Sequence, residues 1–360
     1  MKPSVTLADV AALAGVSVPT ASRALNGVGR VSAATRARVA DAAARIGFRP
    51  NALARSFVTG RSGVIGVIID AHRTFAAPVI IGATTALGAR NMAALAFDAH
   101  ANRASRAEVI ATLNARKVDG VLVIGHSEPL LEPSMFAGLD APAVFVYGVR
   151  EAPDAATFEP DGFAAGRMAG EHLTGLGRTR ISHITAAGDP AANQRAAGLQ
   201  SVLREHSMTL AGGGAPVSGD WTRRTGIEGM KHLLERGDEI DAVFCGNDQI
   251  AWGAYSVLRA RGIAVPDDVA LMGYDNWTAI LESTNNFLTT IDPNLGELGA
   301  TAADFLIDAI TATYQPGGHG IAPTLVPGIS TLGPSGQTGP ASAEGEDDGG
   351  LSLQMWISAM

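Results

Sequence analysis

The stretch from Thr6 to Asn26 has the pattern of two short helices joined by a tight turn. Thr6 suits a helix N-cap, and Asp9 three residues later places a carboxylate at the positive helix start. Gly15 stands where the chain must turn sharply, at a position that favours positive φ. Ser17 can cap the second helix. Pro19 is tolerated in the first turn of that helix, since it removes only an amide that has no helical partner.

The spacing of apolar residues predicts which side of each helix is buried. The inward residues are Leu7, Val10, Ala11 and Ala14 in the first helix and Ala21 and Leu25 in the second. Other side chains of the second helix, Arg23 among them, are then available to a partner. We interpret the stretch as a helix-turn-helix, whose second helix enters the major groove of DNA.

The charge distribution indicates a polyanionic partner for the N-terminal part alone. The whole chain has a net charge of −8, but residues 1–61 carry nine Lys and Arg against two Asp. A basic segment of net charge +7 joined to an acidic remainder is typical of a phosphate-binding domain attached to a domain that does not bind phosphate.

Composition narrows the class of protein. A length of 360 residues, with 46% hydrophobic and 17% charged residues, predicts a globular chain of two or three domains. No run of apolar residues is long enough to span a membrane, and the N-terminus lacks an apolar signal region. The sole cysteine, Cys245, cannot form an internal disulfide. We therefore expect a cytoplasmic protein without a membrane partner.

A third helix and a short hinge helix are predicted next. Ser32 can cap a helix that runs to about Ile46 and that Gly47 ends. Asn51 can cap one or two turns over residues 52–57, and such a short helix needs DNA or a second subunit to hold it.

From Val64 onward, buried apolar strands alternate with amphipathic helices. The predicted strands are 64–69, 92–97, 120–124, 143–147, 181–185, 242–245 and 269–272, and the predicted helices are 78–91, 104–116, 163–176, 195–206, 222–235, 249–261 and 295–313. Such a pattern favours parallel sheets covered on both faces, and this number of units favours two open sheets over one. The fold class is therefore an N-terminal all-α helix-turn-helix head and an α/β core of two doubly wound parallel-sheet subdomains. Ligands of such folds bind in the loops that follow the strands.

With these parts in order, the chain resembles the LacI/GalR family of bacterial transcription regulators. The head matches as VTLADVAALAGVSVPTASRALNG followed by VSAATRARVADAAARIGFRPNALARS. The core matches as DGFAAGRMAGEHLTGLG, QRAAG, GDW, FCGNDQIAWGA, GIAVPDDVALMGYDN and LTTID. The resemblance implies a homodimer that binds a near-palindromic operator, most often as a repressor, and a periplasmic-binding-protein-like core that closes on a small-molecule effector. The tail lacks leucine heptads, so we expect dimers rather than tetramers.

The resemblance also sets the expected domains. These are a DNA-binding head at 1–49, a hinge helix and linker at 50–61, an effector-binding and dimerisation core at 62–333, and a disordered tail at 334–360.

By resemblance, Val18, Pro19 and Arg23 meet base edges, and only Arg23 can make a bidentate contact, preferably to guanine. Residues that match phosphate-contacting or positioning sites are Thr6, Ser17, Thr20, Ser22, Asn26, Arg30, Ser32 and Thr35. For Thr6, Ser17 and Ser32, helix capping alone is the alternative. Asn51, Ala54 and Arg55 fit the hinge helix that enters the minor groove, and Phe57 stands where the family usually has a wedging leucine.

The expected effector contacts are Phe75, Asp161, Arg195, Trp221, Asn247 and Asp275. Asp275 follows a buried strand and can accept hydrogen bonds from vicinal hydroxyls, and Trp221 offers a face of the kind that sugar rings lie against. Arg195 is expected to reach the ligand from the start of its helix. Helix capping is the alternative for Asp161 and for the neighbouring Asp248, and a place in the core is the alternative for Trp221.

These groups favour a neutral sugar as effector. A nucleoside or other metabolite, acting as a corepressor, is the alternative, and His72 and Arg73 leave room for an anionic group such as a uronate or phosphate. No dinucleotide-binding, phosphate-binding or metal-ligand motif is present, so we expect no enzyme activity, no cofactor and no metal. A transport binding protein would share the core but would lack the helix-turn-helix.

Overall fold

The computed structural model describes residues 5–27, 29–48, 60–69, 76–98, 103–125, 136, 138–147, 155–212, 214–237, 239–276, 286–311 and 316–333. Its contacts divide the chain into a first unit, Met1–Asp161 with Asn294–Ala322, and a second unit, Gly162–Pro293 with Pro323–Met360. Each unit is therefore built from two segments that are far apart in the sequence.

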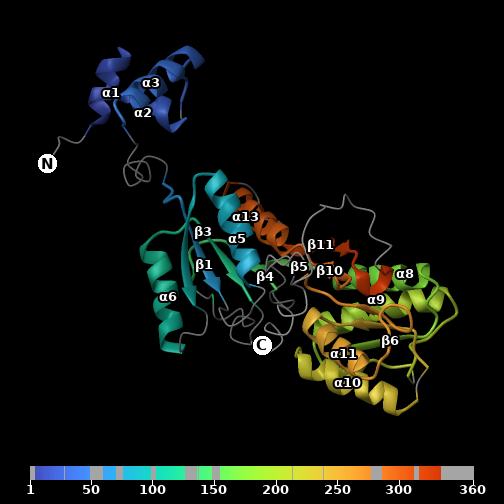
Figure 1. Ribbon diagram of the computed structural model, residues 1–360. Helices are drawn as coiled ribbons and strands as arrows, with labels where there is room; N and C mark the ends of the chain where they lie inside the picture. Colours follow the sequence, from blue (N-terminus) through green and yellow to red (C-terminus); the bar gives the residue numbers. More distant parts are fainter. Residues whose placement is uncertain are drawn as a thin grey trace. The chain divides into compact units, whose positions relative to one another are not determined.

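Three N-terminal helices form a small core of their own (Figure 1). They are α1 (Leu7–Ala14), α2 (Val18–Asn26) and α3 (Ala33–Arg45). Val10, Ala21 and Val39, one from each helix, are fully buried. The inward stripes predicted from the spacing are confirmed, since Leu7, Ala14 and Leu25 also pack against this core.

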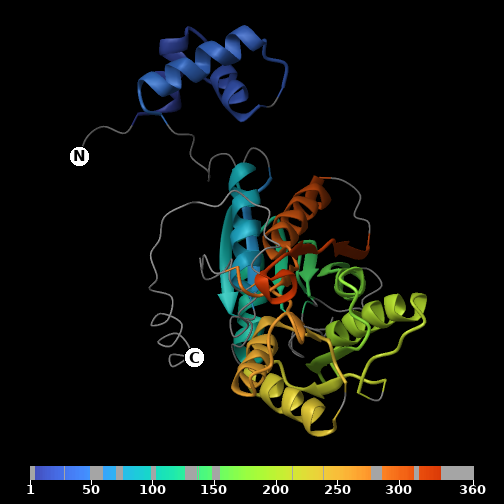
Figure 2. The same ribbon diagram turned by 45° about the vertical axis from the view of Figure 1, so that its right-hand side comes forward.

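A parallel sheet of six strands organises the rest of the first unit. Its order is β11 (Gly317–Ile321), β5 (Ala156–Pro160), β4 (Ala143–Val146), β3 (Gly120–Ile124), β1 (Val64–Ile69) and β2 (Ala93–Asp98). Alternate side chains point to opposite faces. On one face Ile65 and Val67 pack beneath α5 (Ala76–Ala89) and α13 (Leu295–Thr311), which lie side by side in cyan and orange-red in Figure 2. On the other face, Ile68 packs with Leu113 of α6 (Arg103–Ala115).

The second unit contains a parallel sheet of four strands. Its order is β7 (Val217–Gly219), β6 (Ile181–Ala186), β8 (Ala242–Cys245) and β9 (Ala270–Met272), and the antiparallel pair β10 (Thr290–Asp292) and β12 (Thr324–Val326) with the short α14 (Ile329–Leu332) completes the unit. The helices α8 (Gly162–Gly175) and α9 (Pro190–Glu205) cover one face, and α10 (Arg223–Glu235) and α11 (Asp248–Ala260) cover the other. The prediction of two open parallel sheets is confirmed.

Glycines bring α8 and α9 into backbone contact. A Cβ atom at Gly166 would lie 2.0 Å from the carbonyl oxygen of Arg195, and one at Gly198 would lie 2.1 Å from that of Phe163. Gly226 and Gly253 bring α10 and α11 together in the same way. Both layers of helices therefore depend on the absence of a side chain at these positions.

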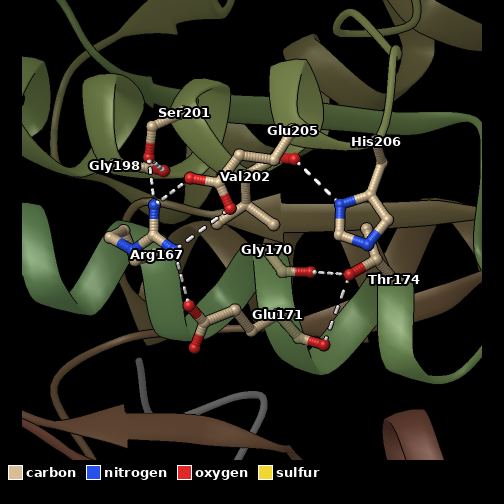
Figure 3. A network of polar contacts seen from close by, with 9 residues as sticks. All are labelled: Arg167, Gly170, Glu171, Thr174, Gly198, Ser201, Val202, Glu205 and His206. Carbon is tan, nitrogen blue, oxygen red and sulfur yellow. Dashed lines mark hydrogen bonds and ion pairs between the residues drawn. The ribbon is translucent and has the colours of Figure 1, made fainter.

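A polar network joins the same two helices at the surface (Figure 3). Arg167 of α8 donates from Nη1 to Ser201 Oγ at 3.1 Å and to Glu205 Oε1 at 2.6 Å, both on α9, and from Nη2 to Glu171 Oε1 at 2.9 Å. These charge-assisted bonds fix the register of α9, on which one candidate ligand residue lies.

Several elements were not predicted from the sequence. They are β5, β7, β10, β11, β12 and α14. Three of these strands have three residues each, too few for an apolar period to show, and β11 has the sequence Gly-Gly-His-Gly-Ile. The predicted hinge helix at 52–57 and the tail at 334–360 lie outside the described residues.

Candidate functional site

The first helix of the head begins with a reciprocal cap. Asp9 N donates to Thr6 Oγ1, and Asp9 Oδ2 accepts from Thr6 N at 2.8 Å and from Thr6 Oγ1 at 2.7 Å. The bond from the Thr6 backbone, followed by that from its side chain, lowers the pKa of Asp9. The capping box fixes the angle at which the chain enters the head.

The turn between α1 and α2 depends on a left-handed residue. Gly15 has φ +64°, as its place in the sequence predicts, and its N–H closes the end of α1. Ser17 then caps α2 by accepting from Thr20 N at 3.3 Å, with Pro19 in the first turn. Ser32 caps α3 in the same way through Thr35 N. Capping by Thr6, Ser17 and Ser32 is thus confirmed, and the prediction that they also position phosphates stays a prediction.

The outer face of α2 carries the predicted base-contacting residues. Val18 and Pro19 are exposed, and Val18 has a fractional exposure of 44%. Arg23 is exposed as well, and its Nε donates to Pro19 O at 3.2 Å. This bond holds the guanidinium along the helix. The contact of Arg23 with a guanine edge stays a prediction.

The predicted phosphate-positioning residues lie around this face. Thr20, Ser22 and Asn26 are on α2, where Asn26 Nδ2 donates to Ser22 Oγ at 3.3 Å. Arg30 is exposed in the loop before α3, and Thr35 lies in the first turn of α3. Of the remaining predicted DNA contacts, Asn51, Ala54, Arg55 and Phe57 lie outside the described residues.

The second unit gathers its polar residues at one edge of its sheet. Trp221 follows β7, Asp189 follows β6, Asn247 follows β8 and Asp275 follows β9. Because all four strands are parallel, their carboxyl ends meet at this edge, as predicted.

Arg195 forms the centre of this group. Its guanidinium carbon lies 4.9 Å from the centre of the Trp221 ring and 4.2 Å from that of the Tyr274 ring. The side chain has a fractional exposure of only 5%. Two aromatic faces therefore hold one cation in place by cation–π attraction.

Asp189 holds the Trp221 side chain in place through the indole nitrogen. Its Oδ2 accepts from Trp221 Nε1 at 3.0 Å, while its Oδ1 accepts from Ala191 N and caps α9. Burial raises the pKa of Asp189, but the bonds from Trp221 and the helix start outweigh burial and lower it overall. An ionised Asp189 thus orients Trp221, which lies partly in the core and partly at the sheet edge.

Two expectations about helix starts are wrong. The helix that carries Arg195 begins at Pro190, so Arg195 lies in its second turn rather than at its start. The cap of α11 is Asn247, whose Oδ1 accepts from Ile250 N at 2.8 Å. Asp248 is instead buried and accepts from Thr290 Oγ1 at 2.6 Å. The carboxylate points into the unit because Thr290 and the Tyr274 backbone, which accepts from Asp248 N, hold it there.

Asp275 has an unusual backbone. Its φ is +107° and that of Asn276 is +52°, both in a region that side chains rarely adopt. Asn276 Nδ2 donates to Asp292 Oδ2 at 2.8 Å, and Asp275 N donates to Ile291 O, which holds the turn in this form. Strain of this kind persists where the surroundings impose it and is typical of ligand sites.

The remaining two predicted contacts are not among the described residues of the second unit. Asp161 is an exposed residue of the first unit, just after β5. Phe75 lies outside the described residues. Sequence reasoning missed Asp189 and Tyr274, although the pair Asp189-Pro190 has the pattern of a helix start.

No group of three or more His, Cys, Asp or Glu side chains in the described part of the chain could hold a metal ion. Within the same residues, no helix has the length and apolar character needed to cross a membrane.

Two protein-family descriptions match the chain. "Bacterial regulatory proteins, lacI family" matches residues 6–51, which contain the three-helix head. "Periplasmic binding protein-like domain" matches residues 171–331, which contain the strand ends described above.

Among known proteins, the chain is 32% identical to the HTH-type transcriptional regulator CelR of Thermobifida fusca, over 86% of this chain and 94% of that protein. The fold is similar to a solved transcriptional regulator CelR–cellobiose complex, with TM-score 0.63 and 30% identity over 91% of this chain and 99% of that one. It is also similar to the lac repressor dimer bound to operator and the anti-inducer ONPF, with TM-score 0.65 and 25% identity over 92% and 100% of the two chains.

Proposed function

Because the chain belongs to the lacI family of bacterial regulatory proteins, we propose that it is a repressor whose homodimer binds a near-palindromic operator under the control of a sugar. It is a DNA-binding transcription regulator. The main support for operator binding under the control of a sugar is that one chain has both an exposed Arg23 on a capped recognition helix and Arg195 held at a sheet edge.

A sugar is supported by the chemistry of that edge. Asp275 and Asn247 supply carboxylate and amide oxygens and Arg195 supplies N–H donors, which together suit vicinal hydroxyls. The negative charges of Asp189 and Asp275 disfavour a highly anionic ligand. The rings of Trp221 and Tyr274 already hold Arg195, which leaves less aromatic face for stacking a nucleobase or a sugar ring, so the proposal depends on the hydrogen-bonding groups.

We expect Asp275→Ala to weaken sugar binding by about 10- to 100-fold, since a hydrogen bond to a charged group contributes about 1.5–3 kcal/mol. Isothermal titration with cellobiose, glucose and ribose, and with adenosine for the nucleoside alternative, measures this. Asp267→Ala, which removes an exposed carboxylate of the same unit, is the control. An Asp275→Ala protein that binds the same sugar as tightly as the wild type contradicts the assigned role.

A homodimer is supported by an uncharged surface of the first unit. No residue of α5 is charged, and Ile81 on it has a fractional exposure of 65%. The neighbouring β2 is the edge strand of its sheet, and its alanines Ala93, Ala94 and Ala96 are exposed. Apolar faces of this kind are typical of subunit interfaces.

Ile81→Lys is expected to shift the protein from dimer to monomer, because it places two charges against each other at a two-fold interface. Light scattering after size exclusion measures the mass, and operator affinity should fall with it. Leu176→Lys, at an apolar residue of 39% exposure in the second unit, is the control. A mutant that remains dimeric excludes α5 from the interface.

The proposed control is a shift in population. The sugar stabilises one of two conformations of the dimer, and operator affinity changes because only one conformation holds both heads in register. Gel retardation of DNA from upstream of the gene, with and without sugar, tests the function as a whole. A protein that retards no such DNA is not an autoregulating repressor.

A further inference from the structure

Four buried polar atoms of the second unit have no hydrogen-bond partner among the described residues. One is Arg223 Nε on α10, and the other three belong to β6 and α9. These three are His183 Nε2, Thr185 Oγ1 and Arg195 Nε. The three residues have fractional exposures of 1%, 3% and 5%. More than nine in ten buried polar groups are paired in folded proteins, so three such atoms in one region call for a common cause.

The hydrogen bond of His183 defines what its free nitrogen can do. His183 Nδ1 lies 2.9 Å from Phe244 O, and a carbonyl oxygen can only accept, so Nδ1 carries the proton. Burial, the largest influence, and the charge of Arg195 lower the pKa of His183 to about 4 overall, although the bond to Phe244 O raises it. The ring is therefore neutral, and Nε2 is a lone-pair acceptor inside the protein.

Strand periodicity places His183 and Thr185 on the face of the sheet that α9, the helix of Arg195, covers. His183 and Thr185 are two residues apart on β6, so both face the layer of α8 and α9. His183 pairs with Phe244 on β8, their rings stack at 4.8 Å, and Phe244 pairs with Met272 on β9. One row further lies Tyr274, whose ring faces the Arg195 guanidinium.

Thr185 lies close to Trp221, the ring that faces Arg195. A Cβ atom on Gly246 would lie 2.5 Å from Thr185 Oγ1 and 2.9 Å from the Trp221 ring. Thr185 thus lies beside the tryptophan that covers Arg195. The charge of Arg195 also lowers the pKa of His183, which agrees with their places on facing elements.

One water molecule within reach of all three atoms would satisfy the whole set. It would accept from Arg195 Nε–H and donate its two protons to His183 Nε2 and Thr185 Oγ1, which gives the three hydrogen bonds typical of a buried water. A direct bond from Arg195 Nε to His183 Nε2 would leave Thr185 unpaired. The donor and acceptor count therefore favours the bridged arrangement.

We propose that His183 is a positioning residue for effector binding, which with Thr185 holds Arg195 Nε through one shared water and so fixes the guanidinium between Trp221 and Tyr274. The inference rests on the proposed function, in which Arg195 contacts the sugar. His183 itself lies one row below the strand ends and does not touch the ligand.

The test compares three variants with the wild type, using the tightest-binding sugar of the cellobiose, glucose and ribose panel. His183→Leu keeps the bulk and removes the acceptor, and we expect it to weaken sugar binding about tenfold. His183→Gln restores an acceptor near the position of Nε2 and is expected to bind nearly as the wild type does. Thr185→Val is expected to give a smaller loss than His183→Leu.

Melting temperature is measured on the same samples, because a merely structural His183 would change stability without changing the affinity of the folded protein. Wild-type affinity in His183→Leu overturns the proposal. A second measurement needs no sugar: a high-resolution crystal structure should contain a water within about 3.2 Å of all three atoms. An Arg195 Nε paired elsewhere overturns the proposal; absence of any sugar binding contradicts the proposed effector instead, and the water alone then decides the role of His183.

Discussion

Arg23→Ala is expected to lower affinity for the operator by about 10- to 100-fold, since a bidentate contact to guanine contributes about 1–3 kcal/mol of discrimination. Binding to unrelated DNA should fall far less, because that term depends on the summed charge of the head. Fluorescence anisotropy with labelled operator and with a scrambled duplex measures both affinities.

The matched control is Arg45→Ala, which removes the same charge from the last turn of α3. It should lower both affinities by a small and similar factor. If Arg45→Ala and Arg23→Ala weaken operator binding equally, Arg23 contributes only charge and the base-reading role is wrong. Arg23 stands out because its bond to Pro19 O directs it along the recognition helix.

Gly198→Ala is expected to destabilise the second unit by about 3 kcal/mol, at the upper end of what overpacking costs. An added Cβ would lie 2.1 Å from Phe163 O and 2.8 Å from Arg167 N, which are backbone atoms that cannot rotate away. The helices α8 and α9 must separate, although alanine alone would favour the helix by about 1 kcal/mol. Because Arg195 lies one turn earlier on α9, sugar affinity should fall as well.

Gly175→Ala is the control for this prediction. Gly175 ends α8 in the same unit, and a Cβ there would meet no atom within 4 Å. Thermal unfolding should show equal or higher stability for Gly175→Ala and a clear loss for Gly198→Ala. Equal melting temperatures for the two variants would mean that the helices accommodate a side chain at their contact.

The head could be predicted residue by residue because its signals are local. Capping by Thr6 and Ser17, the left-handed Gly15 and the position of Pro19 each act within about four residues. Prediction from these local signals failed where two adjacent residues can both cap the same helix. Asn247 and Asp248 can both cap a helix, and the extended backbone of Asn247, with φ −152° and ψ 173°, decides between them.

The core could be predicted as a class but not in its details. Long apolar strands such as β1 and β3 gave the parallel sheets, whereas β7, β10 and β12 carry no period in three residues. The start of α9 was missed because apolar spacing was weighed above the Asp189-Pro190 cap.

The grouping of Arg195 with Trp221 and Tyr274 could not be predicted from the sequence. These residues come from two separate strand ends and one helix, and only the strand order brings them together. The buried His183 of β6 gave no signal in the sequence, because its hydrogen-bond partner is a backbone carbonyl of the neighbouring strand β8.

The most direct test of the account is the operator affinity of the full chain with and without a saturating sugar that calorimetry has shown to bind. Thermodynamic linkage between the two sites predicts a change of at least about tenfold in the operator Kd, with the same factor in the sugar Kd when operator is present. An operator Kd that stays the same under saturating sugar would contradict the claim that the core controls the head.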